Sequence, residues 1–237
     1  MRAGLFVTTI ASIQDLGVQS TRHFKLAFAE GTHFEYDAGQ FVNAMIPTEV
    51  KVLKRPYSIA SSPTWPGYID MCWKKIPGGA ATEHLWKLQI GDRLEIQGPL
   101  GRFTLKNKPV PKAYVFISTG TGIAPFRSMI HDMLERKENV QIWNIFGNRY
   151  EEDILYREEF EELARRHANL KNVFTVSRPT KWNGETDYVQ YMLKKYVPNP
   201  DGVHIYICGL TNMIMEVEKT ALEMGFTKQQ IFYEKYD

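Results

Sequence analysis

The sequence predicts two domains, a β-barrel followed by an open α/β domain, because the spacing of its apolar residues changes near residue 108. Before that point, short runs of alternating apolar and polar residues are separated by turn residues, which is typical of an antiparallel barrel or sandwich. After it, strand-like runs alternate with helical segments, which indicates a parallel sheet with helices on both faces. The proline-containing segment Asn107 to Pro111 predicts the boundary, giving domains of residues 1–108 and 109–237.

The first half contains five candidate strands, at residues 22–28, 39–47, 55–62, 68–76 and 92–103. In the earliest of them, Phe24, Leu26 and Phe28 recur at every second position, which places them on one face of the strand. One short helix is expected from Gly79 to about Leu88.

The second half contains five further candidate strands, at residues 113–118, 140–147, 170–177, 203–209 and 229–236. Helical segments separate them. In one of these, Phe160, Leu163, Ala164 and His167 share the spacing of a single helical face. An acidic run over residues 150–162 is interpreted as a solvated helix start. The order favours an open, parallel, five-stranded sheet.

Composition excludes several kinds of protein. A net charge of +2 over 237 residues does not indicate nucleic-acid binding. Two cysteines, Cys72 and Cys208, are too few to ligate an iron–sulfur cluster. The six histidines lack metal-ligand spacing, and His131 with Glu135 is interpreted as a solvated polar pair. Because no segment is typical of a signal peptide or membrane span, we expect a cytoplasmic protein without membrane contact.

Two glycine-containing turns could each bind a phosphate. In "STGTGIAPFRSMI", Gly120 and Gly122 would let backbone N–H groups approach an anion where a helix begins. In "IPGGAATEHL", Gly79 precedes a helix whose first turn carries the Thr82 hydroxyl. Neither turn is a dinucleotide fingerprint or a P-loop, so an ordinary strand-to-helix turn and a simple helix cap are the alternatives.

The stretch "RPYSIASSP", residues 55–63, has an unusual composition for a strand. The strand period places Arg55, Tyr57 and Ile59 on one face and Ser58 on the other. A cation, an aromatic ring and hydroxyl groups held this closely suggest that the strand binds a flavin.

Six motifs together resemble the ferredoxin–NADP reductase family of two-domain flavoenzymes. They are "RPYSIASS", "GG-x-x-T-x-x-L", "GPLGRF", "STGTGIAPFRSM", "ICG" and a terminal "YEKYD". The similarity extends from Asp37 to the last residue. It implies a six-stranded FAD-binding barrel, followed by an NAD(P)-binding domain.

The resemblance implies roles for the residues that would bind FAD. Arg55, followed by Pro56, would pair with the FAD pyrophosphate. Tyr57 would stack on the isoalloxazine ring, and Ser58 would form a hydrogen bond near flavin N5. The pyrophosphate would also lie at the helix N-terminus formed by Gly79, Ala80, Ala81 and Thr82.

Four residues are expected at the redox centre: Ser58, Cys208, Glu234 and Tyr236. Cys208, followed by Gly209, would lie beside the nicotinamide ring at the carboxyl end of a parallel strand. We expect Tyr236 to lie against the isoalloxazine face opposite Tyr57 and to move when nicotinamide binds. The chain departs from its relatives here, because Asp237 takes the last place.

The nucleotide is expected to be NADPH/NADP+. Its backbone contacts would come from Thr119, Gly120, Thr121 and Gly122. Ser177 and Arg178 would meet the 2′-phosphate, with Arg149 and Lys181 adding positive charge and Tyr188 stacking on adenine. The same region is also similar to NADH-using relatives, so NADH is the alternative.

The resemblance implies hydride transfer from NADPH to flavin N5, followed by single-electron transfer to a separate ferredoxin or flavodoxin. Seven basic residues could form a docking surface or could be scattered solvated side chains: Lys51, Lys54, Lys74, Lys75, Arg102, Lys106 and Lys108. We expect a monomer. The alternatives are an NADH-dependent reductase component of an oxygenase system and a non-autonomous electron-transfer flavoprotein subunit.

Overall fold

The computed structural model describes residues 3–18, 20–48, 50–106 and 110–236. The chain divides into two compact units. The first consists of Met1–Leu105 with Ala124–Glu135, and the second of Lys106–Ile123 with Arg136–Asp237. The boundary expected at residues 108 and 109, and the expected surface residue Lys108, lie outside the described residues.

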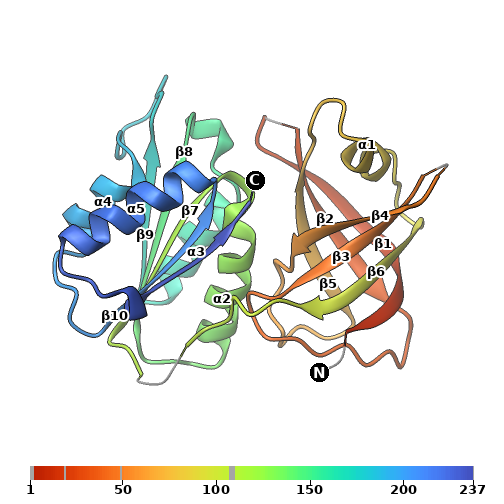
Figure 1. The fold of residues 1–237 in the computed structure, drawn as a ribbon, viewed down its shortest axis with the longest axis horizontal. Coiled ribbons are helices and arrows are strands. Elements are labelled where there is room, and N and C mark those ends of the chain that lie inside the picture. The colour runs from red at the N-terminus through yellow and green to blue at the C-terminus, as the bar shows by residue number, and fades with distance from the viewer. Residues whose placement is uncertain (1–2, 19, 49, 107–109, 237) are drawn as a thin grey trace. The chain divides into compact units, whose positions relative to one another are not determined.

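The first unit contains a six-stranded antiparallel sheet in the order β4-β3-β6-β1-β2-β5 (Figure 1). Its strands are β1 (Gly4–Leu16), β2 (Thr21–Phe28), β3 (Phe41–Pro47), β4 (Val52–Ser58), β5 (Tyr68–Lys74) and β6 (Arg93–Leu100). The two edges meet where Ile59 bridges Met71 and the Ala60 N–H donates to the Asp70 carbonyl oxygen at 2.8 Å. The predicted six-stranded barrel is confirmed. Strand β1 is an element that the sequence pattern did not predict.

Alternation along the strands builds the core of this unit. On β3, Val42, Ala44 and Ile46 are fully buried, whereas the residues between them are half-buried. These side chains therefore fill the barrel interior, as expected for an antiparallel sheet with one face in contact with solvent. The short helix α1 (Ala80–Trp86) adds Ala81 and Leu85 to the same core.

The second unit contains a five-stranded parallel sheet in the order β11-β10-β7-β8-β9, which confirms the prediction. Its strands are β7 (Ala113–Thr119), β8 (Gln141–Asn148), β9 (Leu170–Val176), β10 (Val203–Gly209) and β11 (Ile231–Lys235). Every residue of β10 is buried, and so is every residue of β7 except Thr119. Continuous burial is typical of central parallel strands that are covered on both faces.

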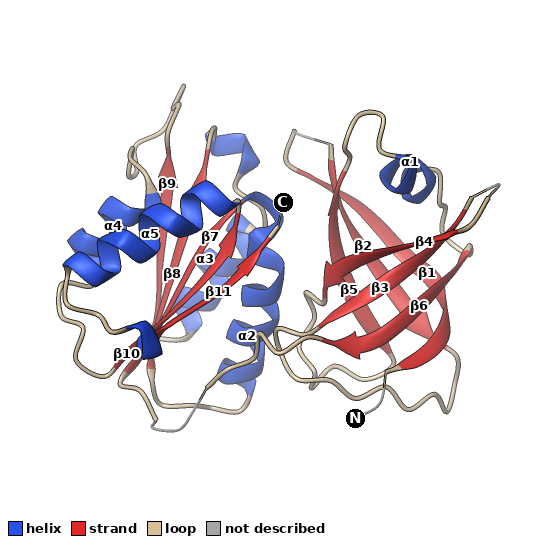
Figure 2. Ribbon diagram, viewed as in Figure 1, coloured by secondary structure: helices blue, strands red, loops and turns tan. Residues whose placement is uncertain are grey.

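Three helices of the second unit pack against this sheet: α3 (Arg157–Arg166), α4 (Val189–Tyr196) and α5 (Thr211–Glu223). Figure 2 shows α4 and α5 side by side on one face of the sheet. In α3, Phe160 and Leu163 are buried as their spacing predicted, and His167 follows as the C-cap. Within the described residues, no helix combines the length and the apolar character needed to span a membrane.

Helix α2 (Ile123–Glu135) is attached to the barrel strands. Nη1 of the buried Arg127 donates to the Ala60 carbonyl oxygen at 2.9 Å and to Asp70 Oδ2 at 3.1 Å. On the far side of this carboxylate, His23 Nε2 lies 3.4 Å from Asp70 Oδ1. Arg127 therefore bonds both to β5 and to the segment that follows β4.

The last turn of α2 binds the same segment. The Glu135 carboxylate accepts hydrogen bonds from Ser62 Oγ at 2.9 Å, from Trp65 Nε1 at 2.6 Å and from the Thr64 hydroxyl. His131 is buried, with its ring centroid 4.7 Å from that of Trp65. The interpretation of His131 and Glu135 as a solvated pair was therefore wrong for His131, which is buried against Trp65. Glu135 is exposed as expected, although its carboxylate also accepts hydrogen bonds from the segment after β4.

Candidate functional site

Strand β4 presents Arg55 and Tyr57 as predicted. The Arg55 side chain is exposed, and its Nη1 donates to the Lys54 carbonyl oxygen at 3.0 Å. Tyr57 is half-buried, with its ring centroid 5.4 Å from that of Trp73. Burial raises the pKa of Tyr57 to about 12, against the opposing charge of Arg55. The strand thus offers an accessible cation and a neutral phenol ring on one face.

The serines of this motif are buried, and Ser61 and Ser62 form hydrogen bonds within the first unit. Ser58 lies on the opposite face of β4 from Tyr57. Ser61 Oγ forms a 2.9 Å hydrogen bond with the Tyr36 hydroxyl and accepts the Asp70 N–H at 3.0 Å. Ser62 donates to Glu135. The hydroxyl groups of Ser61 and Ser62 therefore fix the segment after β4.

The turn before α1 is closed by the Thr82 hydroxyl. Thr82 Oγ1 accepts the Ile76 N–H at 3.1 Å and lies 3.1 Å from both the Ile76 and the Gly79 carbonyl oxygens. This hydroxyl is engaged by the turn, so an anion at this helix would meet mainly the backbone N–H groups of the first turn. Gly79 is the N-cap, Ala80 is exposed and Ala81 is buried.

The second glycine turn, the 3-10 helix η1 (Gly120–Gly122), lies against the end of β10. A Cβ atom on Gly122 would lie 2.3 Å from the Cys208 carbonyl oxygen. A Cβ atom on Gly209 would lie 2.7 Å from Thr119 Oγ1. Glycine therefore lets the carboxyl ends of β7 and β10 approach closely. This is the point where the strand order reverses, and open α/β sheets bind ligands there.

The second unit brings together three of the expected redox residues, whereas Ser58 belongs to the first unit. Cys208 on β10 pairs in register with Glu234 on β11, and the Tyr236 N–H donates to the Gly209 carbonyl oxygen at 3.0 Å. Burial, with a smaller contribution from the Glu234 charge, raises the pKa of the Cys208 thiol. A hydrogen bond from the Tyr236 side chain opposes this rise in pKa.

We expect neither cysteine to react with a thiol–disulfide exchange reagent in the native protein at neutral pH. Cys208 is fully buried with a raised pKa, and Cys72 is only 5% exposed. Reaction requires an accessible thiolate, which neither side chain offers. Absorbance titration of the released reagent should show two thiols only after denaturation. Rapid titration of one thiol in the native protein would contradict the burial of that cysteine.

The ends of β8 and β9 carry the residues expected at the adenosine 2′-phosphate. The Ser177 N–H donates to the Asn148 carbonyl oxygen at 3.0 Å, and the Arg178 N–H donates to the Arg149 carbonyl oxygen at 2.8 Å. Both arginine side chains are exposed. Lys181 and Tyr188 are also exposed, and Tyr188 is the N-cap of α4. Arg149, Ser177 and Arg178 thus belong to one hydrogen-bonded cluster.

Sequence reasoning missed Glu151, which lies within the acidic run interpreted as solvated. Its carboxylate accepts hydrogen bonds from the Thr180 N–H, the Thr180 hydroxyl and the Lys181 N–H. The local sequence offers no signal for this role, because its neighbour Glu152 is equally acidic and is exposed.

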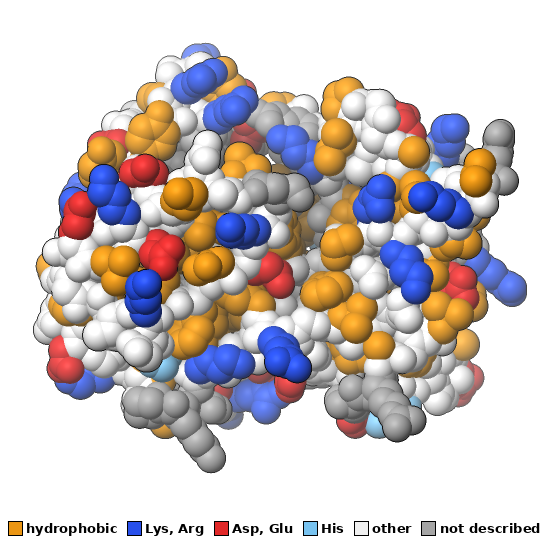
Figure 3. All heavy atoms as spheres, viewed as in Figure 1, with side chains coloured by type: hydrophobic (Ala, Val, Ile, Leu, Met, Phe, Trp, Pro, Cys, Tyr) orange, Lys and Arg blue, Asp and Glu red, His pale blue; other side chains and the backbone are white. Residues whose placement is uncertain are grey.

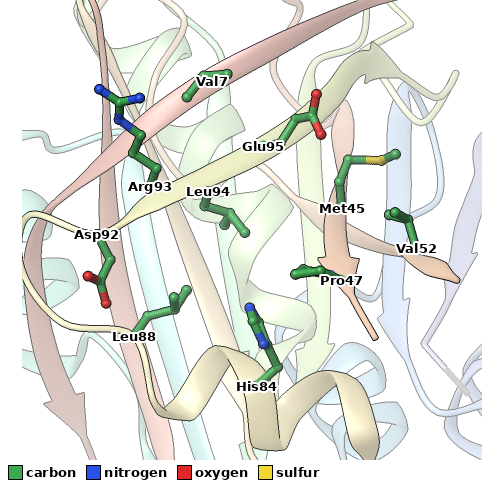
Figure 4. A pocket seen from close by; sticks show the side chains of 10 residues that line it. All are labelled: Val7, Met45, Pro47, Val52, His84, Leu88, Asp92, Arg93, Leu94 and Glu95. Carbon is green, nitrogen blue, oxygen red and sulfur yellow. The ribbon is translucent and has the colours of Figure 1, made fainter. Parts of the chain in front are cut away.

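A pocket of about 520 Å³ in the first unit lies apart from these motifs (Figure 4). It is lined by apolar residues together with His84, Asp92, Arg93 and Glu95, and no predicted site residue lines it. Among the described residues, no group of three or more His, Cys, Asp or Glu side chains could hold a metal ion.

Two family models match the chain. The oxidoreductase FAD-binding domain matches residues 9–105, and the oxidoreductase NAD-binding domain matches residues 116–219. The matches assign the flavin to the half that contains β4 and α1, and the nicotinamide nucleotide to the half that contains η1 and β10.

Individual relatives extend these matches over most of the chain. Ferredoxin–NADP reductase B of Sorangium cellulosum is 36% identical, over 91% of this chain and 91% of its own. NADH-cytochrome b5 reductase 2 of Aspergillus niger is 31% identical, over 78% of this chain and 63% of its own. A cytochrome P450 reductase of Amycolatopsis has a crystal structure that superposes with a TM-score of 0.89 at 25% identity, over 98% of this chain and 70% of its own.

Proposed function

Because the chain belongs to the ferredoxin–NADP reductase family of flavin oxidoreductases, we propose that it oxidises NADPH and passes the electrons through FAD to a separate ferredoxin or flavodoxin. The observation that carries the choice of nucleotide is the cluster at the ends of β8 and β9, where Arg149 and Arg178 are joined through their backbones.

The first unit offers groups that suit FAD. The exposed Arg55 guanidinium can pair with a pyrophosphate through two parallel hydrogen bonds. Pro56 follows Arg55, and the half-buried ring of Tyr57 can stack on an isoalloxazine with Ser58 near its N5. The first turn of α1 supplies backbone N–H groups from Gly79, Ala80, Ala81 and Thr82. Bound FAD would supply the redox chemistry, accepting a hydride and releasing electrons singly.

The second unit offers groups that suit the nicotinamide end. Backbone groups of Thr119, Gly120, Thr121 and Gly122 would orient the nucleotide at the switch point. In our proposal, the Cys208 thiol stays protonated and serves as a small packing group beside the nicotinamide. Glu234 and Tyr236 hold it from β11 and from the residue that follows this strand. The work of these residues is to orient the ring, and no proton transfer is assigned to them.

NADPH is favoured over NADH by charge. Strand β8 ends at Asn148 and is followed by Arg149, rather than by an acid that would bind a ribose 2′-hydroxyl. Ser177, Arg178 and Lys181 would bind the 2′-phosphate, and Tyr188 would stack on adenine. The similarity to an NADH-cytochrome b5 reductase keeps the NADH-dependent reductase as the second candidate.

The acceptor is proposed from the family and from surface charge. Among the residues expected to dock an acidic carrier, Lys51, Lys54, Lys74 and Arg102 are exposed. Lys75 is half-buried and pairs with Glu83 at 3.4 Å. In Figure 3 the basic side chains are spread among neutral and apolar ones. The face drawn there therefore has no concentrated basic patch that would identify an acidic carrier, and the carrier must be tested directly.

The proposal predicts a yellow protein that releases FAD on denaturation and oxidises NADPH with a dye acceptor. We expect kcat/KM for NADPH to exceed that for NADH by about tenfold or more, because the 2′-phosphate gains charge-assisted hydrogen bonds. Steady-state kinetics with both nucleotides, and then with ferredoxin, flavodoxin and cytochrome b5, measure this preference. A preference for NADH would favour the second candidate, and a chain unable to bind FAD would overturn the function.

A further inference from the structure

The loop of residues 177–181 is fixed at both ends. At its start, the Ser177 and Arg178 N–H groups donate to the carbonyl oxygens of Asn148, the last residue of β8, and of Arg149, which follows it. At its end, Glu151 reaches across from the 3-10 helix η2 (Glu151–Asp153). The Thr180 hydroxyl donates to Glu151 Oε1 at 2.5 Å, and the Thr180 N–H lies 3.2 Å from Oε2. The Lys181 N–H donates to Oε1 as well.

This arrangement orders residues that would otherwise be mobile on the surface. Arg178, Thr180 and Lys181 are all exposed, so few packing contacts hold this segment. If a ligand must order a loop when it binds, the affinity of the protein for that ligand falls by the free energy of ordering the loop. The Glu151 carboxylate removes that cost in advance, because three N–H and O–H groups converge on it before any nucleotide arrives.

The sign of the charge makes this contact unexpected. A carboxylate near a phosphate opposes phosphate binding, so Coulomb's law alone predicts that Glu151 weakens NADPH binding. Hydrogen bonds from Thr180 and Lys181 lower the pKa of Glu151 to about 2. Glu151 is therefore ionised at every pH where the enzyme would work. Ordering of the loop by Glu151 would strengthen NADPH binding, whereas repulsion between its charge and the phosphate would weaken it. Substitution of Glu151 shows which effect is larger, because the two predict opposite changes in affinity.

We propose that Glu151 is a positioning residue that sets the preference for a nucleotide carrying a 2′-phosphate. It does so by holding the backbone of Thr180 and Lys181, and thereby the cations of the loop, in the geometry that the phosphate requires. The inference rests on the proposed placement of the 2′-phosphate at Ser177, Arg178 and Lys181. It assigns Glu151 no contact with the nucleotide.

The test compares Glu151→Ala with Glu152→Ala, which removes the same charge at the neighbouring exposed position. We expect Glu151→Ala to lower kcat/KM for NADPH about tenfold and to change that for NADH less than about twofold. Inhibition by 2′,5′-ADP should weaken in parallel, whereas inhibition by 5′-ADP should not. Glu152→Ala should leave all four values near those of the unmodified protein.

Thr180→Val provides a second variant that removes one donor and keeps the size of the side chain. It should lower kcat/KM for NADPH selectively by about threefold to tenfold. Thermal unfolding of each variant identifies any general loss of stability. Equal losses with NADPH and NADH in both variants, or tighter binding of 2′,5′-ADP by Glu151→Ala, would overturn the proposal. If the unmodified protein prefers NADH, the proposed nucleotide is wrong, yet a loss confined to 2′-phosphorylated ligands would still support the role of Glu151.

Discussion

Replacing Gly122 by alanine should lower kcat/KM for NADPH by about a hundredfold or more, while FAD stays bound, because a misplacement of about 1 Å costs catalysis that much. The added Cβ atom would lie 2.3 Å from the Cys208 carbonyl oxygen and 3.2 Å from the Gly209 nitrogen. Both atoms belong to the backbone of a central strand, so no side chain can rotate away. Either the glycine turn or the end of β10 must shift, and both would face the nicotinamide nucleotide in our proposal.

Gly120→Ala in the same turn is the matched control. Gly120 has a φ of +54°, but a Cβ atom there would meet no other atom within 4 Å. Its cost is therefore the left-handed backbone penalty of about 1–2 kcal/mol, without a collision. Stopped-flow measurement of flavin reduction, together with the flavin absorbance of the purified variants, separates hydride transfer from FAD binding. If the flavin were reduced at the same rate in Gly122→Ala as in Gly120→Ala, the close approach of η1 to β10 would not be needed for hydride transfer.

Replacing Arg127 by methionine should lower the free energy of unfolding of the first unit by about 3–5 kcal/mol, because it removes one of the two groups that compensate a buried carboxylate and leaves only His23 beside it. Asp70 is 2% exposed and Arg127 is 7% exposed. Burial alone would raise the pKa of Asp70, but hydrogen bonding and charge from His23 and Arg127 hold it below the ordinary value of 3.8. The ionised form therefore stabilises the fold above that pH.

The paired variant Arg127→Met with Asp70→Asn tests the cause. Removing both charges should recover much of the stability, because the incompletely compensated carboxylate is gone. The deficit of Arg127→Met alone should also shrink as the pH falls from 7 towards 4. Without Arg127, His23 alone opposes the effect of burial, so the pKa of Asp70 rises and the carboxyl group becomes neutral at a higher pH. Urea unfolding at both pH values measures this. A double variant no more stable than Arg127→Met would show that the loss comes from packing.

Local patterns predicted most of the fold but missed one strand. The five strands of the parallel sheet were predicted, because central strands such as β7 and β10 are nearly continuous apolar runs. Strand β1 was missed because it is apolar on both faces. Leu5 and Val7 point outward with exposed fractions of 58% and 57%, which hides the period of two set by Phe6, Thr8 and Ile10.

Candidate site residues could be located from the sequence where their motifs are local, and their roles stay predictions. Motifs such as "RPYS" and "GTG" identify their own positions, and pairing in the sheet places Cys208 beside Glu234. The supporting contacts were not predictable, because their partners lie far apart along the chain. Arg127 is 57 residues from Asp70, and Glu151 is 29 residues from Thr180. No pattern within a window of one strand or one helix carries that information.

The attachment of helix α2 limits how the chain can be recombined with its relatives. Arg127 and Glu135 bond to residues 60–70, although α2 follows the glycine turn in the sequence. A chimera with its crossover point at residue 108 would pair a foreign α2 with this barrel, and would keep those bonds only where the foreign helix carries the same side chains. Gene shuffling should therefore succeed where residues 124–135 come from the same parent as the barrel. This requires a second crossover inside the C-terminal half.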